Sequence, residues 1–236
     1  MKKDLSFLKS NIIAHRGYFD NKNIPENSLR AFELAMKKNY IIELDLHLLK
    51  DKKIVVFHDD NLKRMTGINK NIKEYSYDEL KNIKLLNSNY NIPTLEEVLK
   101  LVDGKVPMII EFKYDRKPGQ LEKEAVKQLD NYKGKFSVKS FNPLSVNWFR
   151  KHRPEYIRGL LINYSHKNIK QLITSKMILL NMCKPDYLSC SYKYYKSKKI
   201  KKYREKMPVI AWTIRNKDKY EKVKDSFDNF ICENLE

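Results

Sequence analysis

The chain has 236 residues, which is enough for one sizeable hydrophobic core. Its 42% hydrophobic and 11% aromatic content excludes a disordered chain. The formal net charge of +19 favours polyanions, anionic membrane surfaces or phosphorylated small molecules as partners, although a genomic bias toward lysine codons would produce the same excess.

Eight short apolar runs alternate with polar segments of helical period along the whole chain. This alternation predicts an α/β fold, a (β/α)8 TIM barrel that forms a single domain over residues 1–236. A doubly wound open sheet is the alternative, but no glycine-rich phosphate loop follows the first run. The predicted strands are residues 11–15, 41–46, 106–112, 136–141, 157–162, 186–190, 208–214 and 230–234.

The longest stretch without a barrel strand follows the second predicted strand. Residues 53–58 form an extra apolar run there, which we expect to pair with that strand. Residues 59–93 are too long for a plain loop, so they are predicted to form a small insertion that borders the barrel mouth. A short helix is expected within residues 75–83.

Helix-end signals mark two of the predicted helices. The first covers residues 26–38, and Asn39 is expected to end it in a left-handed conformation. The second follows Thr94, the expected N-cap, with Glu97 as its capping-box partner. Little sequence follows the last strand, so closure of the barrel could rely on residues 1–9 or on a partner chain.

Three carboxylates are predicted to meet at the barrel mouth, where the carboxyl ends of the strands converge. Glu43 and Asp45 occupy alternate positions of one strand and so face the same way, and Glu111 enters from the next barrel strand. Such oxygen ligands suit a hard divalent cation, Ca²⁺ or Mg²⁺. The alternative is a structural ion network that pairs them with Arg16, Lys113 or Lys139.

Two histidines are predicted to lie beside these carboxylates, His15 at the end of the first strand and His58 at the end of the extra run. Two imidazoles suit acid–base chemistry on a phosphate ester, because one can take a proton while the other donates one. Arg16 and Lys113 would bind the phosphoryl oxygens. Three histidines are expected not to react: His47, which could line the mouth, and His152 and His166, which lack such neighbours.

At this point the sequence resembles the glycerophosphodiester phosphodiesterase family of metal-dependent (β/α)8 barrels, over nearly the whole chain. Each motif alone would be weak, but their occurrence in family order is highly specific. The motifs are AHRG (14–17), PENS (25–28), ELDLHLLKD (43–51), VVFHDDNLKRMTG (55–67), IPTLEEVL (92–99), IEFK (110–113), SFNP (140–143) and AWTIRN (211–216).

The resemblance implies hydrolysis of a glycerophosphodiester to sn-glycerol 3-phosphate and an alcohol. In the family's reaction, a neighbouring glycerol hydroxyl attacks phosphorus, and water opens the resulting cyclic phosphate. The insertion at 59–93 would shape alcohol specificity. The implied residues are Glu43, Asp45 and Glu111 for the metal, His15 and His58 for acid–base catalysis, Arg16 and Lys113 for phosphate, Trp212 for the glycerol side, and Glu26 and Asn27 near the metal.

Three departures from the family pattern concern loops. No glycine precedes the second strand, where residues 37–40 stand, and the usual Asp-Gly turn is Asp51-Lys52. Glu233 stands where an aspartate is common. The first two departures bear on loop geometry and leave the implied chemistry intact.

Other functions remain open on the sequence alone. The barrel could be a non-catalytic protein that binds phosphate or anionic lipid, or a phosphodiesterase for a lysophospholipid or a polymeric glycerophosphate. The basic and aromatic tract 192–206 suggests nucleic-acid binding, but it lies where an outer barrel helix is expected, so we expect no specific nucleic-acid partner. Peripheral contact of this tract with an anionic membrane or polymer is the hypothesis that we retain.

The cysteines and the hydropathy pattern bear on compartment. Cys183, Cys190 and Cys232 show neither a disulfide framework nor zinc-ligand spacing, which favours a reducing compartment and argues against the secreted, disulfide-bonded phospholipase D-like toxins. No apolar run approaches membrane-span length. We therefore expect a cytoplasmic protein.

Overall fold

The computed structural model describes residues 3–113, 118–163 and 180–233. Within them, eight parallel strands follow one another in the order β1-β2-β4-β5-β6-β7-β8-β9, and β9 pairs with β1 to close a barrel. β3 adds to β2 in antiparallel orientation. The strands are β1 (Ile13–Ala14), β2 (Ile41–Leu48), β3 (Ile54–Val56), β4 (Met108–Phe112), β5 (Phe136–Ser140), β6 (Ile157–Ile162), β7 (Tyr187–Ser191), β8 (Val209–Ile214) and β9 (Asn229–Cys232).

The predicted TIM barrel is therefore confirmed, and closure through β1 and β9 excludes the open sheet. Every predicted strand end lies within two residues of the observed one. The antiparallel pairing of the extra run is also as expected.

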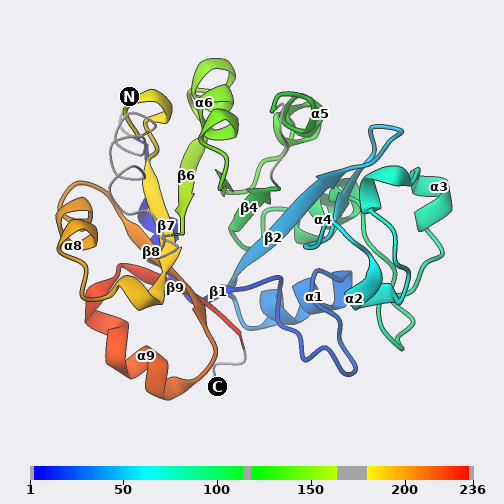
Figure 1. Cartoon of the computed structure of the whole chain (residues 1–236), viewed down its shortest axis with the longest axis horizontal. Helices are drawn as coiled ribbons and strands as arrows, with labels where there is room; N and C mark the ends of the chain where they lie inside the picture. The colour runs from blue at the N-terminus through cyan, green and yellow to red at the C-terminus, as the bar shows by residue number, and fades with distance from the viewer. Residues whose placement is uncertain (1–2, 114–117, 164–179, 234–236) are drawn as a thin grey trace.

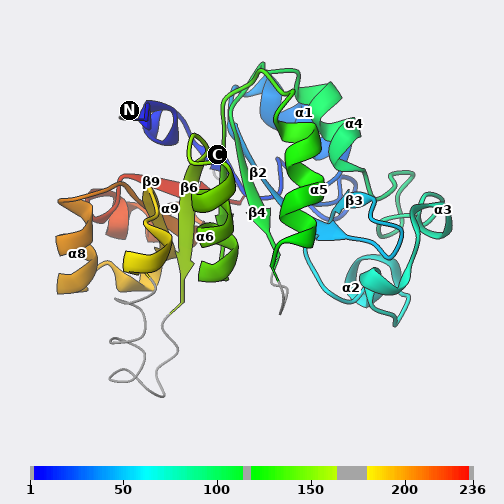
Figure 2. The same ribbon diagram turned by 90° about the horizontal axis from the view of Figure 1, so that it is seen from above.

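Helices surround the strands on the outside of the barrel (Figures 1 and 2). The expected N-cap of α4 is confirmed, since the hydroxyl of Thr94 accepts from the backbone N–H of Glu97 and the Glu97 carboxylate accepts from that of Thr94. The helices are α1 (Leu29–Lys37), α2 (Lys63–Thr66), α3 (Tyr77–Leu80), α4 (Leu95–Val102), α5 (Gln120–Leu129), α6 (Pro143–His152), α8 (Lys198–Arg204) and α9 (Lys217–Val223), with 3-10 turns η1 (Ser6–Lys9), η2 (Ile72–Glu74), η3 (Tyr192–Tyr194) and η4 (Lys224–Ser226). No helix of the described residues is long and apolar enough to cross a bilayer.

Alternation along the strands separates an outer core from the barrel interior. On β2, Ile42, Leu44 and Leu46 face outward and pack with apolar residues of the surrounding helices. The intervening positions face inward, first Ile41 and then the carboxylates. The barrel is thus apolar at its amino end and charged at its carboxyl end.

The N-terminal turn η1 fills the amino end of the barrel. Phe7 and Leu8 are buried there against inward-facing residues of six strands. One of these is Tyr187, whose ring occupies space that any Cβ at Gly159 would clash with, at 2.3 Å. The expectation that the N-terminal segment supports the barrel fits this packing, together with the β1–β9 pairing.

The segment between β3 and α4 packs on a hydrophobic cluster of its own. Its short helix α3 follows Ser76, whose backbone N–H donates to Glu79, as expected for a helix within 75–83. The cluster includes Leu62, Met65 and Leu85. This segment lies to one side of the barrel, around α2 and α3 (Figure 1).

Two loops that lack the glycine expected from the family pattern each contain another residue in the left-handed backbone conformation. Asn39 follows α1 with φ 56°, the left-handed conformation predicted for it. Lys52, in the β2–β3 turn, has φ 66° although lysine carries a Cβ that disfavours this region. Both loops therefore contain a left-handed residue that is not glycine.

Candidate active site

The three predicted carboxylates lie together at the carboxyl end of the barrel. Asp45 on β2 is paired in register with Glu111 on β4, and Glu43 precedes Asp45 by one strand period. One carboxylate oxygen from each of the three lies within 4.8 Å of the others, and all three residues are buried. This arrangement could hold a metal ion.

The same carboxylates also form the ion network that the sequence left as an alternative. Lys113 Nζ lies 2.6 Å from Asp45 Oδ1 and 2.7 Å from Glu111 Oε1. Lys139 is the fourth residue of β5, and its Nζ lies 2.7 Å from Glu43 Oε1. Burial acts to raise the pKa of Asp45, but Lys113 and the neighbouring positive groups outweigh it and hold that pKa well below the ordinary range. Burial likewise acts to raise the pKa of Glu111, but Lys113 and Lys139 prevail and lower it, so both of these carboxyl groups are disposed to remain anionic.

The loop after β1 brings a second set of polar groups to this cluster. Arg16 has φ 54° and its backbone N–H donates to Glu43 Oε2 at 3.1 Å. The turn continues through Gly17, where an added Cβ would lie 2.8 Å from the backbone of Ala31, so only glycine fits. The loop then returns so that Asn27 Nδ2 donates to Asp45 Oδ2 at 2.9 Å. The proximity expected of Asn27 to the carboxylates is present.

His15 is held by a carboxylate and an arginine from the other end of the chain. Its Nδ1 lies 2.6 Å from Glu233 Oε1, and its Nε2 lies 4.0 Å from Glu43 Oε2. Arg215 Nε donates to the second oxygen of Glu233 at 2.7 Å. Burial acts to raise the pKa of Glu233, but the hydrogen bonds with His15 and Arg215 prevail and lower it to about 2.

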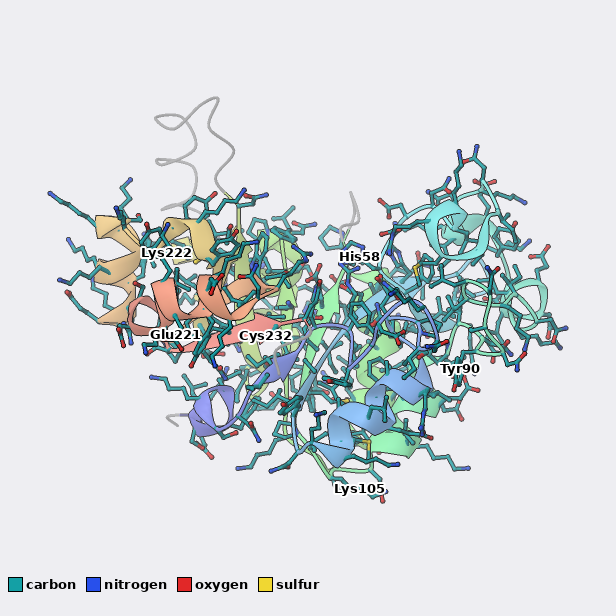
Figure 3. All side chains as sticks on the ribbon, turned by 90° about the horizontal axis from the view of Figure 1, so that it is seen from below. His58, Tyr90, Lys105, Glu221, Lys222 and Cys232 are labelled. Carbon is teal, nitrogen blue, oxygen red and sulfur yellow. The ribbon has the colours of Figure 1, made fainter. Side chains whose placement is uncertain are left out.

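His58 has a parallel arrangement on the other side of the site. Its Nδ1 lies 2.6 Å from Asp59 Oδ1, and Arg64 Nε on α2 donates to Asp59 Oδ2 at 2.6 Å. Arg64 also bonds to Glu26, which receives a hydrogen bond from Arg16 as well. Figure 3 shows His58 on the side of the barrel that faces α2 and α3. Each histidine thus forms a His–carboxylate–Arg chain.

The other histidines differ in environment. His47 is buried, its Nε2 lies 3.2 Å from the backbone oxygen of His58, and burial lowers its pKa to about 4. It does not line the cavity described below. Its contact with the backbone of His58 supports the loop that carries His58. His152 stacks on Trp148 at the exposed end of α6. His166 lies outside the described residues.

A cavity of about 490 Å³ opens above the carboxylates. Asp45 and Glu111 form part of its wall together with His15, His58 and Arg16. Trp212, predicted for the glycerol side, also lines it, packed edge to face on Phe141 at 5.8 Å between ring centroids. Two predicted residues do not line it: Glu43 lies behind the wall against Lys139, and Lys113 against Asp45.

The family model of the glycerophosphoryl diester phosphodiesterase family matches residues 15–228. The chain belongs to this family. A glycerophosphodiester phosphodiesterase of Bacillus altitudinis is 32% identical over 197 residues, which are 71% of this chain and 79% of that protein. The chain is 37% identical to YhdW of Bacillus subtilis over 152 residues, 61% of this chain, and spans 62% of that relative's length.

Solved structures support the same fold. An Oleispira antarctica phosphodiesterase in complex with the product sn-glycerol-3-phosphate superposes with a TM-score of 0.81 at 21% identity, covering 95% of this chain and 93% of that one. Membership of the glycerophosphoryl diester phosphodiesterase family makes the chain an enzyme of the phosphodiesterase class, as the sequence predicted.

Several residues of this family member's site were not assigned to it from the sequence. Lys139 was noted only as a possible ion-pair partner, and Asp59, Arg64 and Arg215 were given no role. Glu233 was noted only as a departure. A signal existed for Glu233, because it follows the last barrel strand, which must lie beside the first.

Proposed function

We propose that this barrel, a single domain over residues 1–236 with an insertion at 59–93, hydrolyses glycerophosphodiesters to sn-glycerol 3-phosphate and an alcohol. The observation that carries the proposal is a cluster of three buried carboxylates at the base of a cavity that two carboxylate-held histidines line. Family membership supports it independently.

We propose Glu43, Asp45 and Glu111 as ligands of Ca²⁺ or Mg²⁺. Their oxygens are the hard donors that these ions prefer, and Asn27 Oδ1, a further oxygen beside Asp45, is buried without a hydrogen-bond partner among the described residues. The donor set therefore fits the ion. When bound, the ion would supply positive charge that offsets the charge developing on the phosphoryl oxygens.

The two histidines are proposed as the acid–base pair. One imidazole takes the proton of the attacking glycerol hydroxyl while the oxygen of that hydroxyl bonds to phosphorus. The other imidazole gives a proton to the oxygen of the leaving alcohol while the bond between that oxygen and phosphorus breaks. Glu233 and Asp59 hold the Nδ1 atoms of His15 and His58, so Nε2 is the nitrogen available for transfer in each. Water then opens the cyclic phosphate by the reverse proton transfers.

Arg16 and Lys113 are proposed to bind the phosphoryl oxygens. Burial acts to lower the pKa of Lys113, but the carboxylates of Asp45 and Glu111 prevail and raise it, so the ammonium stays charged. Its present partners are proposed metal ligands, and when they hold an ion Lys113 becomes available to the phosphate. Trp212 would pack against the carbon atoms of the glycerol.

The direct test measures sn-glycerol 3-phosphate release from glycerophosphocholine with Ca²⁺, Mg²⁺ or EDTA. We expect release with one of the two ions, none with EDTA, and none in Glu43→Gln with either ion. Equilibrium dialysis of the same samples should show loss of ion binding in Glu43→Gln. Glu74→Gln, a surface carboxylate of η2, is the matched control. Equal release with and without EDTA would contradict the metal assignment.

We also propose that the basic tract, residues 192–206, associates with anionic membrane surfaces. The first turns of α8 carry exposed lysines, and a dense positive charge is attracted to anionic headgroups within about one Debye length. Liposome sedimentation should therefore show binding that weakens when four lysines become serine. Equal sedimentation of both proteins would end the idea. The four are Lys198, Lys199, Lys201 and Lys202.

A further inference from the structure

The cavity wall that follows β6 and β7 differs chemically from the side that carries the carboxylates. Asn163 follows β6, Ser191 ends β7, and Lys193 lies in η3 just beyond it; all three line the cavity. In the closed barrel order, β6 and β7 lie diametrically opposite β1 and β2. The cavity-lining carboxylates, Asp45 and Glu111, come from β2 and β4, so the β6–β7 wall has none among the described residues.

An aromatic pair lies between these two sides. Phe141 directly follows β5 and packs on Trp212 of β8. Because β6 and β7 lie between β5 and β8 in the barrel, this contact spans the mouth between the β6–β7 wall and the acid cluster. With the glycerol packed against Trp212 as proposed above, the alcohol arm of a diester is the one left to contact the β6–β7 wall.

The β6–β7 wall carries a positive charge that no carboxylate of the described residues balances. The other three lysine and arginine side chains that line the cavity, Arg16, Lys139 and Arg215, each have a carboxylate within 2.7 Å. Lys193 forms no ion pair with any described residue. An anionic group on a ligand would balance the charge of Lys193.

We infer that the β6–β7 wall binds the leaving alcohol and that Lys193 selects an alcohol that carries its own anionic group, such as a phosphate monoester. This inference rests on the proposed function and assigns the substrate class of the same site. A quaternary ammonium head would be disfavoured there, because Lys193 would repel it and no carboxylate of the wall would offset that repulsion.

A pair of substrates that differ only in this group tests the inference. Glycerophosphoinositol and glycerophosphoinositol 4-phosphate release the same product, sn-glycerol 3-phosphate, so one assay gives kcat/KM for both. We expect the phosphorylated substrate to be preferred about fivefold by the wild type, the size of an ion pair with an exposed lysine. Higher salt should reduce the preference.

Variants of the lysine separate its charge from its bulk. The kcat/KM ratio should fall to about one in Lys193→Ser, return in Lys193→Arg and fall below one in Lys193→Glu. Lys199→Ser removes an exposed lysine of α8 that does not line the cavity, and should keep the wild-type ratio. A wild-type ratio near one, or a ratio that survives in Lys193→Ser, overturns the inference while leaving hydrolysis intact. Absence of hydrolysis of both substrates and of glycerophosphocholine with either ion would overturn the proposed function itself.

Discussion

Replacing Glu233 by Gln should reduce turnover without unfolding the protein. The substitution keeps the shape of the side chain and removes the charge that holds His15 Nδ1 at 2.6 Å. The Glu233 side chain is only 13% exposed, so solvent screens the interaction little. A hydrogen bond to a charged group contributes about 1.5–3 kcal/mol. At about 1.4 kcal/mol per factor of ten, kcat should fall about 10- to 150-fold.

The assay is the concentration dependence of sn-glycerol 3-phosphate release, which separates kcat from KM. KM should change little, because Glu233 holds an imidazole and does not line the cavity itself. Glu221→Gln is the matched control, since this glutamate lies on the outer helix α9, far from His58 in Figure 3. A thermal melt checks folding. Wild-type kcat in a folded Glu233→Gln variant would refute the idea that the carboxylate positions His15.

Three further predictions follow from the same contacts. His15→Ala and His58→Ala should each lower turnover by at least about 10²-fold, the usual size of a lost acid–base group, while His152→Ala should not; full activity in both would exclude the mechanism. Lys52→Gly should raise the free energy of unfolding by about 0.5 kcal/mol in urea titration, because it relieves a left-handed lysine at some cost in chain entropy; a loss of stability would contradict this. The Glu233 pKa of about 2 lies below its ordinary value of 4.5, so its stabilisation should be complete above pH 4.5 and be lost as pH falls toward 2; wild-type and Glu233→Gln stabilities should converge over that range, and a constant difference would refute the assignment.

Residues whose positions follow from strand periodicity were predictable from the sequence. Glu43 and Asp45 share a face because side chains alternate along a strand, and Glu111 joins them because parallel strands carry their carboxyl ends to one mouth. The position of His15 in the site followed from its place at the end of the first predicted strand. These positions depend on period and topology, which local sequence encodes strongly.

The partners of the histidines depend on loop geometry, which the sequence encodes weakly. Arg64 reaches both Asp59 and Glu26 only because α2 begins close beside the β3 end. Arg215 and Glu233 follow the neighbouring strands β8 and β9, whose pairing register shifts near these ends, and there Arg215 donates to Glu233. No periodic pattern marks such contacts, so chemistry at strand ends could be inferred while its supporting groups could not.

The contact between His15 and Glu233 joins residues 218 positions apart in the chain. During synthesis, the ribosome releases the first strand and its histidine long before the last strand exists. A nascent chain therefore has His15 early but cannot orient its imidazole until the last barrel strand and Glu233 have been made. Catalytic competence should appear abruptly with closure of the barrel, so a product that stops before Glu233 would carry most of the site and little of the activity.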